Sequence, residues 1–362
     1  KSGGMRSGIY SYCSSDLCPL TPDPCPLMID VHTPCRLHFG LLAYNPREAR
    51  QFGGVGLMIE RPSIAVRVSP AQDFVAIGPM ANRAEAFART FASNWAARLA
   101  RSRSSSTRPL SGAKIQISHA PRAHTGLGTG TQLAMAVARG LAELAGASAG
   151  HLGVEDLAAL VGRGARSAIG AHGFFHGGLI IEGGKQHRSA LSPMLVQQTF
   201  PSEWRIVLIM PNALVGHSGE REKQAFATMP PIPRETTAEM CRLAMLGLLP
   251  AAIERDLATF SRSLFDLQQR VGECFATVQG GIYADPMLDR IVTYLRDGGI
   301  EGVGQSSWGP TLYALAGDEN TAQNIARDVQ AQFDLSDEEV IITAADNEGC
   351  RVMNEANVPR RT

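Results

Sequence analysis

The sequence lacks an excess of charge of either sign, because its 34 Lys and Arg residues balance 34 Asp and Glu residues. Proteins that attract nucleic acids or anionic membranes over a distance carry a basic surface, so no such partner is predicted. No run of about 18 consecutive apolar residues occurs, which argues against a membrane span. The first residues also lack the basic, apolar and small-residue order of a secretion signal. We therefore expect a cytoplasmic protein.

Cysteine is sparse and irregularly spaced. Seven cysteines in 362 residues are an odd number, which fits a reducing compartment better than a disulfide framework. Cys13, Cys18, Cys25 and Cys35 crowd the first 35 residues, but no two of them form the CxxC pair that is typical of a zinc site. Residues 1–28 are rich in Ser, Pro and Cys and are predicted to form an irregular tail.

A chain of this length can form two domains, each with its own core. We place the boundary near residues 195–203, which gives an N-terminal domain at 29–198 and a C-terminal domain at 199–362. Hydrophobic periodicity predicts helices at residues 82–100, 133–144, 154–161, 236–249, 251–271, 287–296 and 321–333. Strands are predicted at 29–34 (ended by Pro34), at 52–60 and 64–68 (paired around residues 61–63), and at 204–211 and 338–344.

The most informative stretch is PRAHTGLGTGTQ at residues 121–132. It lies between an alternating strand pattern at 115–117 and the predicted helix at 133–144. Glycines let backbone N–H groups converge on one point, and the first amides of a helix have no internal partner. The helix dipole adds positive charge there, so the loop suits a phosphate. The alternative is a tight turn that needs glycine for its geometry alone.

A second dense stretch, at residues 162–178, contains Arg163, Arg166, Ser167, His172 and His176 among six glycines. Packing alone does not readily explain this composition. The two histidines are four residues apart and would be neighbours on one helix face. A third glycine-rich segment, GVGQSSWGP, follows at residues 302–310.

Three motifs in this order resemble the GHMP kinase superfamily: TPCRL at residues 33–37, the loop at 121–131 and the glycine-rich segment at 302–309. The resemblance covers about residues 30–345. It implies an α+β protein with a two-domain GHMP-kinase-like fold. The N-terminal domain would have a ribosomal-protein-like α/β topology and the C-terminal domain would be α+β, with the active site in the cleft between them.

The sequence departs from the kinases of this superfamily at the residues that perform phosphoryl transfer. In the mevalonate-type kinases, the resemblance implies a catalytic aspartate at the end of a Ser-Gly-Val-Asp string, but the matching position here is Gly170. An acidic Mg²⁺ ligand, implied about eleven residues earlier, falls on Ala159, and residues 40–42 lack the usual Gly-Glu-His. The phosphate loop is therefore kept, whereas the groups that deprotonate an alcohol are absent.

One branch of the superfamily, the β-ribofuranosylaminobenzene 5′-phosphate synthases of methanopterin biosynthesis, resembles the chain at residues 36–40, 52–57, 121–132 and 304–310. This resemblance implies a pentosyltransferase that joins phosphoribosyl diphosphate to 4-aminobenzoate or 4-hydroxybenzoate and releases CO₂ and diphosphate. One alternative is an ATP-dependent small-molecule kinase with a relocated base. Another is a ligand-binding homologue without catalysis. A homodimer is left open.

The predicted site combines the three glycine-rich segments. The implied cofactor is Mg²⁺, with the hydroxyls of Thr129 and Thr131 as metal ligands. Arginines would bind the carboxylate and the phosphates, a histidine would handle the proton of the ring substituent, and Trp308 or Phe174 would stack on the ring or pack in the core. The predicted catalytic residues are Arg36, His38, His124, Arg166, His172 and His176. The predicted substrate-binding residues are Arg122, Thr125, Gly126, Leu127, Gly128, Thr129, Gly130, Thr131, Gln132, Arg163, Ser167, Gln305, Ser306, Ser307 and Trp308.

Overall fold

The computed structural model describes residues 27–48, 50–101, 107–147, 152–186, 191–214, 216 and 220–354. Nearly all of the predicted N-terminal tail, with Cys13, Cys18 and Cys25, lies outside the described residues.

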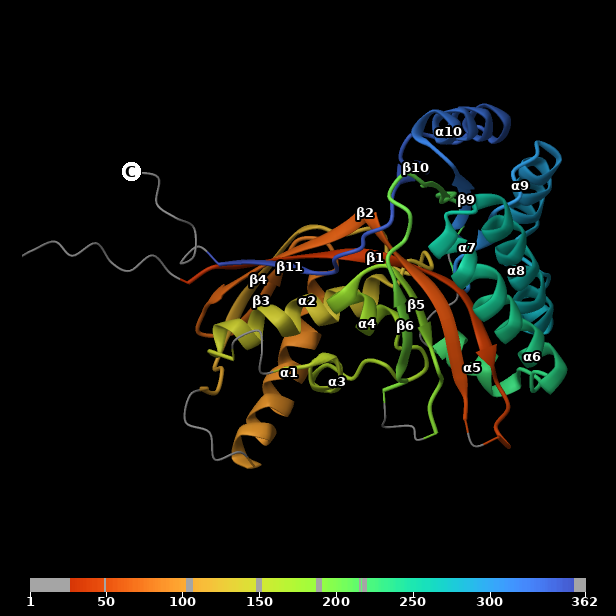
Figure 1. Cartoon of the computed structure of the whole chain (residues 1–362). Helices are drawn as coiled ribbons and strands as arrows, with labels where there is room; N and C mark the ends of the chain where they lie inside the picture. The colour runs from red at the N-terminus through yellow and green to blue at the C-terminus, as the bar shows by residue number, and fades with distance from the viewer. Residues whose placement is uncertain are drawn as a thin grey trace, which may run out of the picture.

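The first half of the chain forms a seven-stranded sheet with helices on one face (Figure 1). Its strands are β1 (Ile29–Ala43), β2 (Phe52–Pro70), β3 (Phe74–Ile77), β4 (Ala113–His119), β5 (Leu179–Glu182), β6 (Met194–Gln198) and the late strand β11 (Arg351–Asn354). The order is β11-β1-β2-β4-β3, and β5 pairs with both β2 and β6. The helices are α1 (Ala81–Arg101), α2 (Thr129–Leu144), α3 (Val154–Leu160) and α4 (Ile169–His176).

The second half forms a four-stranded antiparallel sheet in the order β10-β7-β9-β8, together with the remaining helices. Its strands are β7 (Arg205–Ile209), β8 (Val303–Gln305), β9 (Leu312–Ala316) and β10 (Val340–Thr343). Its helices are α5 (Glu220–Thr228), α6 (Arg234–Arg242), the π-helical turn η1 (Leu243–Leu248), α7 (Leu249–Glu254), α8 (Leu257–Gln279), α9 (Pro286–Asp297) and α10 (Glu319–Phe333). The far ends of β1 and β2 reach towards α5 and α6 (Figure 1).

The chain passes from the first sheet to the second between Gln198 and Arg205, close to the predicted domain boundary. It then returns, because β11 pairs antiparallel with the start of β1. The last strand therefore belongs to the N-terminal sheet in space, although it lies at the C-terminal end of the sequence. The boundary at residues 198/199 itself stays a prediction.

The predicted ends of two strands were wrong. The pattern around Arg61-Pro62-Ser63 predicted a hairpin, but β2 is one strand whose two halves both pair with β1. The pairing slips between Pro34 and Cys35, so that residues 60–62 of β2 form a bulge. Proline lacks an N–H for the ladder and is tolerated at such a bulge, which explains why Pro34 does not end β1 and Pro62 does not end β2.

The helix break predicted at Pro250 was also wrong. The structure is helical without interruption from Arg234 to Glu254, and Pro250 lies in the first turn of α7 after the π-helical turn. The break comes at Arg255, which adopts the left-handed conformation (φ 61°), and Asp256 then caps α8 by accepting from the N–H of Thr259. By length and composition alone this helical stretch could span a membrane; in the structure one side of it packs on α8.

Helix α2 lies under β1 and β2 and fixes the position of the phosphate-type loop (Figure 1). Most of its side chains are buried, including Leu133, Met135 and Val137. Gly140 lets the helix approach the sheet closely, because a Cβ there would lie 2.5 Å from a methyl of Val68. A helix buried this fully is held by packing on the sheet, so its N-terminus is a fixed point for the residues around it.

The loop before α2 is hydrogen-bonded to both halves of the protein. The Oγ of Ser306, in the β8–β9 turn, accepts from the N–H of His38 at 3.0 Å and donates to the carbonyl of Gly126 at 2.8 Å. Gly126 has φ +86°, and a Cβ there would lie 2.4 Å from the carbonyl oxygen of Ser306. The segments predicted as separate motifs therefore form one hydrogen-bonded junction.

Replacing Ser306→Ala should lower the free energy of unfolding by about 1–3 kcal/mol, because it leaves the buried His38 N–H without its acceptor. Urea unfolding followed by circular dichroism measures this change. Ser118→Ala is the matched control, since Ser118 is exposed and its hydroxyl makes only a long 3.5 Å contact. Equal stability of the two variants would contradict the prediction.

Candidate active site

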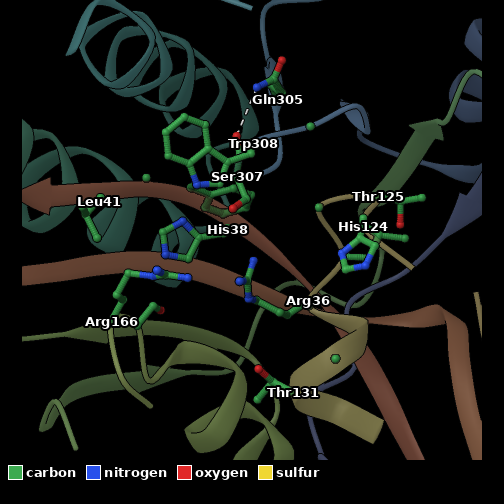
Figure 2. Close-up of a pocket in the computed structure, with 18 of the residues that line it drawn as sticks. Arg36, His38, Leu41, His124, Thr125, Thr131, Arg166, Gln305, Ser307 and Trp308 are labelled. Atoms are coloured by element: carbon green, nitrogen blue, oxygen red, sulfur yellow. Dashed lines mark hydrogen bonds between the residues drawn. The ribbon is translucent and has the colours of Figure 1, made fainter. Parts of the chain in front are cut away.

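A cavity of about 290 Å³ opens where the N-terminus of α2, β1, α8 and the β8–β9 turn meet. Both halves of the chain supply its walls, so it lies between them as the predicted cleft does. Many of the predicted site residues line it: Arg36, His38, His124, Thr125, Gly126, Leu127, Gly128, Thr129, Gly130, Thr131, Arg163, Arg166, Ser167, Gln305, Ser307 and Trp308. Figure 2 shows Arg36, His38 and Arg166 directing their polar ends towards the middle of this cavity.

One end of the cavity is built from the N-terminus of α2. Gly128 precedes the helix with φ 68°, and no side chain caps the helix. The N–H groups of Thr131 and Gln132 bond back to the carbonyl of Gly128. The hydroxyl of Thr129 is buried and has no hydrogen-bond partner among the described residues. An uncapped helix start beside an unused buried hydroxyl is an arrangement that suits an anionic oxygen.

The acidic and basic side chains among the described residues that line the cavity are all basic. Four arginines line it: Arg36, Arg83, Arg163 and Arg166. No Asp or Glu is found among the described residues that line it. Since the described walls carry guanidinium groups and no carboxylate, the cavity is suited to a ligand that carries several negative charges.

Arg83 was missed by the sequence analysis, because it lies on α1, far along the chain from the glycine-rich segments. A signal was present: Arg83 is in the first turn of α1, where the helix dipole favours acidic residues and this helix has none. Its guanidinium lies against the start of α2, since a Cβ on Gly130 would be 2.4 Å from one of its nitrogens. Arg83 reaches the cavity because α1 packs beside α2.

His38 lies in the middle of the cavity wall and is almost fully buried. Burial, and secondly the charge of Arg36, hold the pKa of His38 well below its usual value, so the ring is neutral near pH 7. Its Nε2 atom has no hydrogen-bond partner among the described residues. A neutral imidazole with an unused nitrogen can accept a proton from a ligand.

The other end of the cavity is aromatic and apolar. Trp308 packs edge-on against Phe275 with ring centroids 4.7 Å apart, and against Phe226 at 5.6 Å. The guanidinium of Arg166 lies 4.9 Å from the centre of the Phe226 ring. Trp308 thus packs in a cluster and also lines the cavity, so the two interpretations of this residue are compatible. A flat aromatic ligand with one anionic group would fit such an end.

Glu182, at the end of β5, is a buried acid beneath the site that the sequence analysis also missed. Burial raises its pKa, although its Oε2 accepts from the N–H of Ala168 at 2.7 Å. The unpartnered Oε1 of Glu182 and Nε2 of His38 both lie within about 3.5 Å of the point where a Cβ on Gly54 would be. A four-residue strand gives no sign in the sequence that its last side chain lies near the site.

The walls do not form a metal site by themselves. Among the described residues there is no group of three or more His, Cys, Asp or Glu that could hold a metal ion. The oxygens that line the cavity come from hydroxyl, amide and backbone groups. Mg²⁺ usually takes a carboxylate together with phosphate oxygens and water, so any Mg²⁺ here would depend on phosphate oxygens of a ligand. Of the two predicted ligands, Thr129 offers a hydroxyl that has no other partner.

Three of the predicted binding residues lie outside the cavity and hold the loop in place instead. The guanidinium of Arg122 donates to the carbonyls of Met210 and Asn212 in the second half of the protein. The side-chain amide of Gln132 donates to the carbonyl of Gly170 at 2.7 Å and accepts from the hydroxyl of Thr33. Ser306 forms the junction described above.

His172, His176 and Phe174 also lie outside the cavity. They are on α4, which packs on β1, β2 and β5. His172 is buried with its Nε2 2.8 Å from the carbonyl of Ser192, and Phe174 is fully buried in the core. The two histidines lie on one helix as predicted, but neither lines the cavity.

Comparison with known proteins shows which family the chain belongs to. The family profiles of the GHMP kinases N terminal domain and the GHMP kinases C terminal domain match residues 90–178 and 248–335. The β-ribofuranosylphenol 5′-phosphate synthase of Archaeoglobus fulgidus is 33% identical over 339 residues, which cover 90% of this chain and 99% of the relative. The enzyme of that name from Methanocaldococcus jannaschii is 27% identical, over 89% of this chain and 99% of its own. The chain belongs to the β-ribofuranosylphenol 5′-phosphate synthase family.

This membership confirms the predicted family and makes the protein an enzyme of the pentosyltransferase type. Solved structures confirm the GHMP-kinase-like fold. A homoserine kinase from Cytophaga hutchinsonii aligns with a TM-score of 0.67 at 17% identity, over 96% of this chain and 100% of its own. A mevalonate diphosphate decarboxylase from Enterococcus faecalis aligns with a TM-score of 0.62 at 15% identity, over 91% of this chain and 99% of its own. At these identities the likeness concerns the fold alone.

The two positions where kinases of this superfamily would carry acids have different surroundings. Gly170 lies beside the loop, since a Cβ there would be 3.3 Å from the methyl of Thr131. Ala159 is on the exposed side of α3 and does not line the cavity. Neither position supplies a carboxylate to the cavity.

Thr129→Ala and Thr131→Ala should each lower kcat by about 10²–10³-fold, because each removes a hydroxyl from the anion-binding end. Steady-state kinetics of the purified variants measures the loss. Thr90→Ala is the matched control, since Thr90 is an exposed helix residue on α1. Wild-type turnover in both loop variants would mean that the loop is only a turn.

His38 should make stability depend on pH. The unfolded chain protonates this histidine below about pH 6.5, whereas burial keeps the folded ring neutral, so the unfolded state binds more protons and stability falls as the pH drops below 6.5. His38→Gln should reduce that slope by up to about 1.4 kcal/mol per pH unit between pH 6.5 and 5. Burial lowers the pKa of His172 too, so wild type and variant are compared by urea unfolding at each pH. Identical slopes would contradict the assignment.

Proposed function

We propose that the protein transfers the phosphoribosyl group of phosphoribosyl diphosphate to 4-hydroxybenzoate, with release of CO₂ and diphosphate. The observation that carries this proposal is one cavity with two different ends: a cationic end at the start of α2, whose described walls hold no carboxylate, and an aromatic end at Trp308. A sugar diphosphate matches the first end and a benzoate matches the second. The relatives' name specifies a phenol, which favours the hydroxy acid over 4-aminobenzoate.

The reaction balances without an oxidant or reductant. The bond between C1 of the ribose and the diphosphate oxygen breaks, and its electron pair leaves with the diphosphate. The ring carbon that bears the carboxylate bonds to C1. The bond to the carboxylate then breaks, CO₂ leaves, and that electron pair restores the aromatic ring. The product is a β-C-riboside 5′-phosphate.

The cationic end would lower the barrier to departure of the diphosphate. Negative charge grows on the leaving oxygen as C1 becomes oxocarbenium-like, and the amides at the start of α2 and the arginines are fixed donors for it. One such donor commonly contributes about 2.7–4 kcal/mol. Mg²⁺ bound to the diphosphate would neutralise further charge, with the Thr129 hydroxyl as its ligand from the chain.

The aromatic end would hold the benzoate ring in line with C1. Trp308 and Phe226 offer surfaces for the ring, and Arg36 or Arg166 can bind its carboxylate. Positioning of two reactants in this way can supply roughly 7–11 kcal/mol. Of the four predicted histidines, His38 is neutral, buried and on the cavity wall, and it is our candidate to accept and return the proton of the ring hydroxyl.

We infer from the resemblance to the methanopterin branch that the product serves the biosynthesis of a methanopterin-type cofactor in the cytoplasm. Both proposed substrates are small, and neither requires a nucleic-acid or membrane partner.

The test is to incubate the purified protein with phosphoribosyl diphosphate, Mg²⁺ and carboxyl-labelled 4-hydroxybenzoate or 4-aminobenzoate. We expect labelled CO₂ and one diphosphate for each CO₂, with higher kcat/KM for the hydroxy acid. No labelled CO₂ from either acid would refute the proposal. Formation of ADP from ATP would favour the small-molecule kinase, and binding without product would favour the ligand-binding homologue.

A further inference from the structure

Arg83 and Arg163 form a pair of guanidinium groups at the start of α2. They come from different elements, α1 and the segment between α3 and α4. Both guanidinium groups lie near the ring of Phe87. That of Arg163 is 4.6 Å from the ring centre and that of Arg83 is 6.0 Å from it. Both side chains line the cavity.

Neither guanidinium makes a hydrogen bond or an ion pair with any residue that the structure describes, and the Nε of Arg163 is fully buried without a partner. By contrast, Arg89 of α1 donates to Glu85 at 2.8 Å. Burial, and secondly the charge of Arg83, lower the pKa of Arg163 to about 10, so the group stays charged at pH 7. Two charged, partly buried and unpaired groups next to each other destabilise the folded protein unless an anion binds to them.

The position of the pair indicates which anion it receives. Arg83 touches Gly130 in the first turn of α2, where the unpartnered hydroxyl of Thr129 also lies. Guanidinium groups, helix amides and a hydroxyl then converge on one place. Of the anionic groups of phosphoribosyl diphosphate, the diphosphate carries the most charge, and no carboxylate is present on the described walls to hold a metal ion against it.

We propose that Arg83 and Arg163 form the subsite for the terminal phosphate of the leaving diphosphate, and that their two charges do much of the neutralisation that a carboxylate-held metal ion would otherwise do. This inference rests on the proposed function for the identity of the substrate. The pair would bind the diphosphate more tightly as the C1–O bond breaks, and it would hold the product diphosphate afterwards. Phe87 fixes the plane of Arg163 and is a positioning residue.

The experiment measures binding of inorganic diphosphate and of ribose 5-phosphate to the full-length protein by calorimetry, with and without Mg²⁺. Arg83→Gln and Arg163→Gln should each raise the Kd for inorganic diphosphate at least tenfold and change the Kd for ribose 5-phosphate less than threefold. Arg89→Gln, on the same helix but paired on the surface, is the control and should change neither. Arg83→Lys and Arg163→Lys keep the charge and serve if a Gln variant fails to fold; they should weaken diphosphate binding by a smaller factor.

Three results would overturn the proposal: no binding of diphosphate to the wild type, unchanged binding in the variants, or a greater loss for ribose 5-phosphate than for diphosphate. The last would assign the pair to the 5-phosphate. Since binding is measured without turnover, the result is separate from that of the labelled CO₂ assay. Loss of diphosphate affinity in a protein that releases no CO₂ would support the subsite and refute the proposed reaction.

Discussion

The structure around the site depends on one hydrogen-bonded junction, in which the loop before α2 is held between β1 and the β8–β9 turn. Ser306 bonds to both neighbours, and the hydroxyl of Thr311 donates to the carbonyl of Thr125 at 2.6 Å. On the other side, the N–H of Arg36 donates to the carbonyl of Leu127 at 3.1 Å. Because the loop cannot move without breaking these bonds, the start of α2 is held in place, as a pre-organised anion site would require.

Charge distinguishes this cavity from a site built for phosphoryl transfer. The mevalonate-type kinases of this fold are expected to use a catalytic aspartate and an acidic Mg²⁺ ligand, whereas Gly170 and Ala159 occupy the matching positions here. Arginines line the cavity instead, and the histidine beside them is kept neutral by burial. A site of this kind is better suited to stabilising a leaving group than to activating a nucleophile. The same fold thus supports different chemistry through the side chains of its loops.

Much of the fold and part of the site could be predicted from local sequence patterns. Glycine placement predicted the loop, and 3.6-residue periodicity predicted the helices α1 and α2. These are local patterns, and the structure of such segments depends little on the rest of the chain. The predictions that failed concerned prolines. Pro62 and Pro250 were taken as breaks, but a bulge on β2 and a π-helical turn before α7 accommodate them. Such adjustments depend on what the segment packs against, which a local pattern does not contain.

The sequence by itself determined the family and the glycine loop before α2, because glycines and hydroxyls in a fixed order set both the backbone geometry and its hydrogen-bond donors. Only the tertiary structure decided which side chains reach the cavity. In the folded protein Arg83 of α1 lines the cavity and Glu182 lies beneath it, whereas His172 is buried outside the cavity. The physical reason is that membership of a cavity follows from how helices pack on a sheet. That packing brings together residues far apart in the chain, so the spacing of residues along the chain does not predict which of them line the cavity.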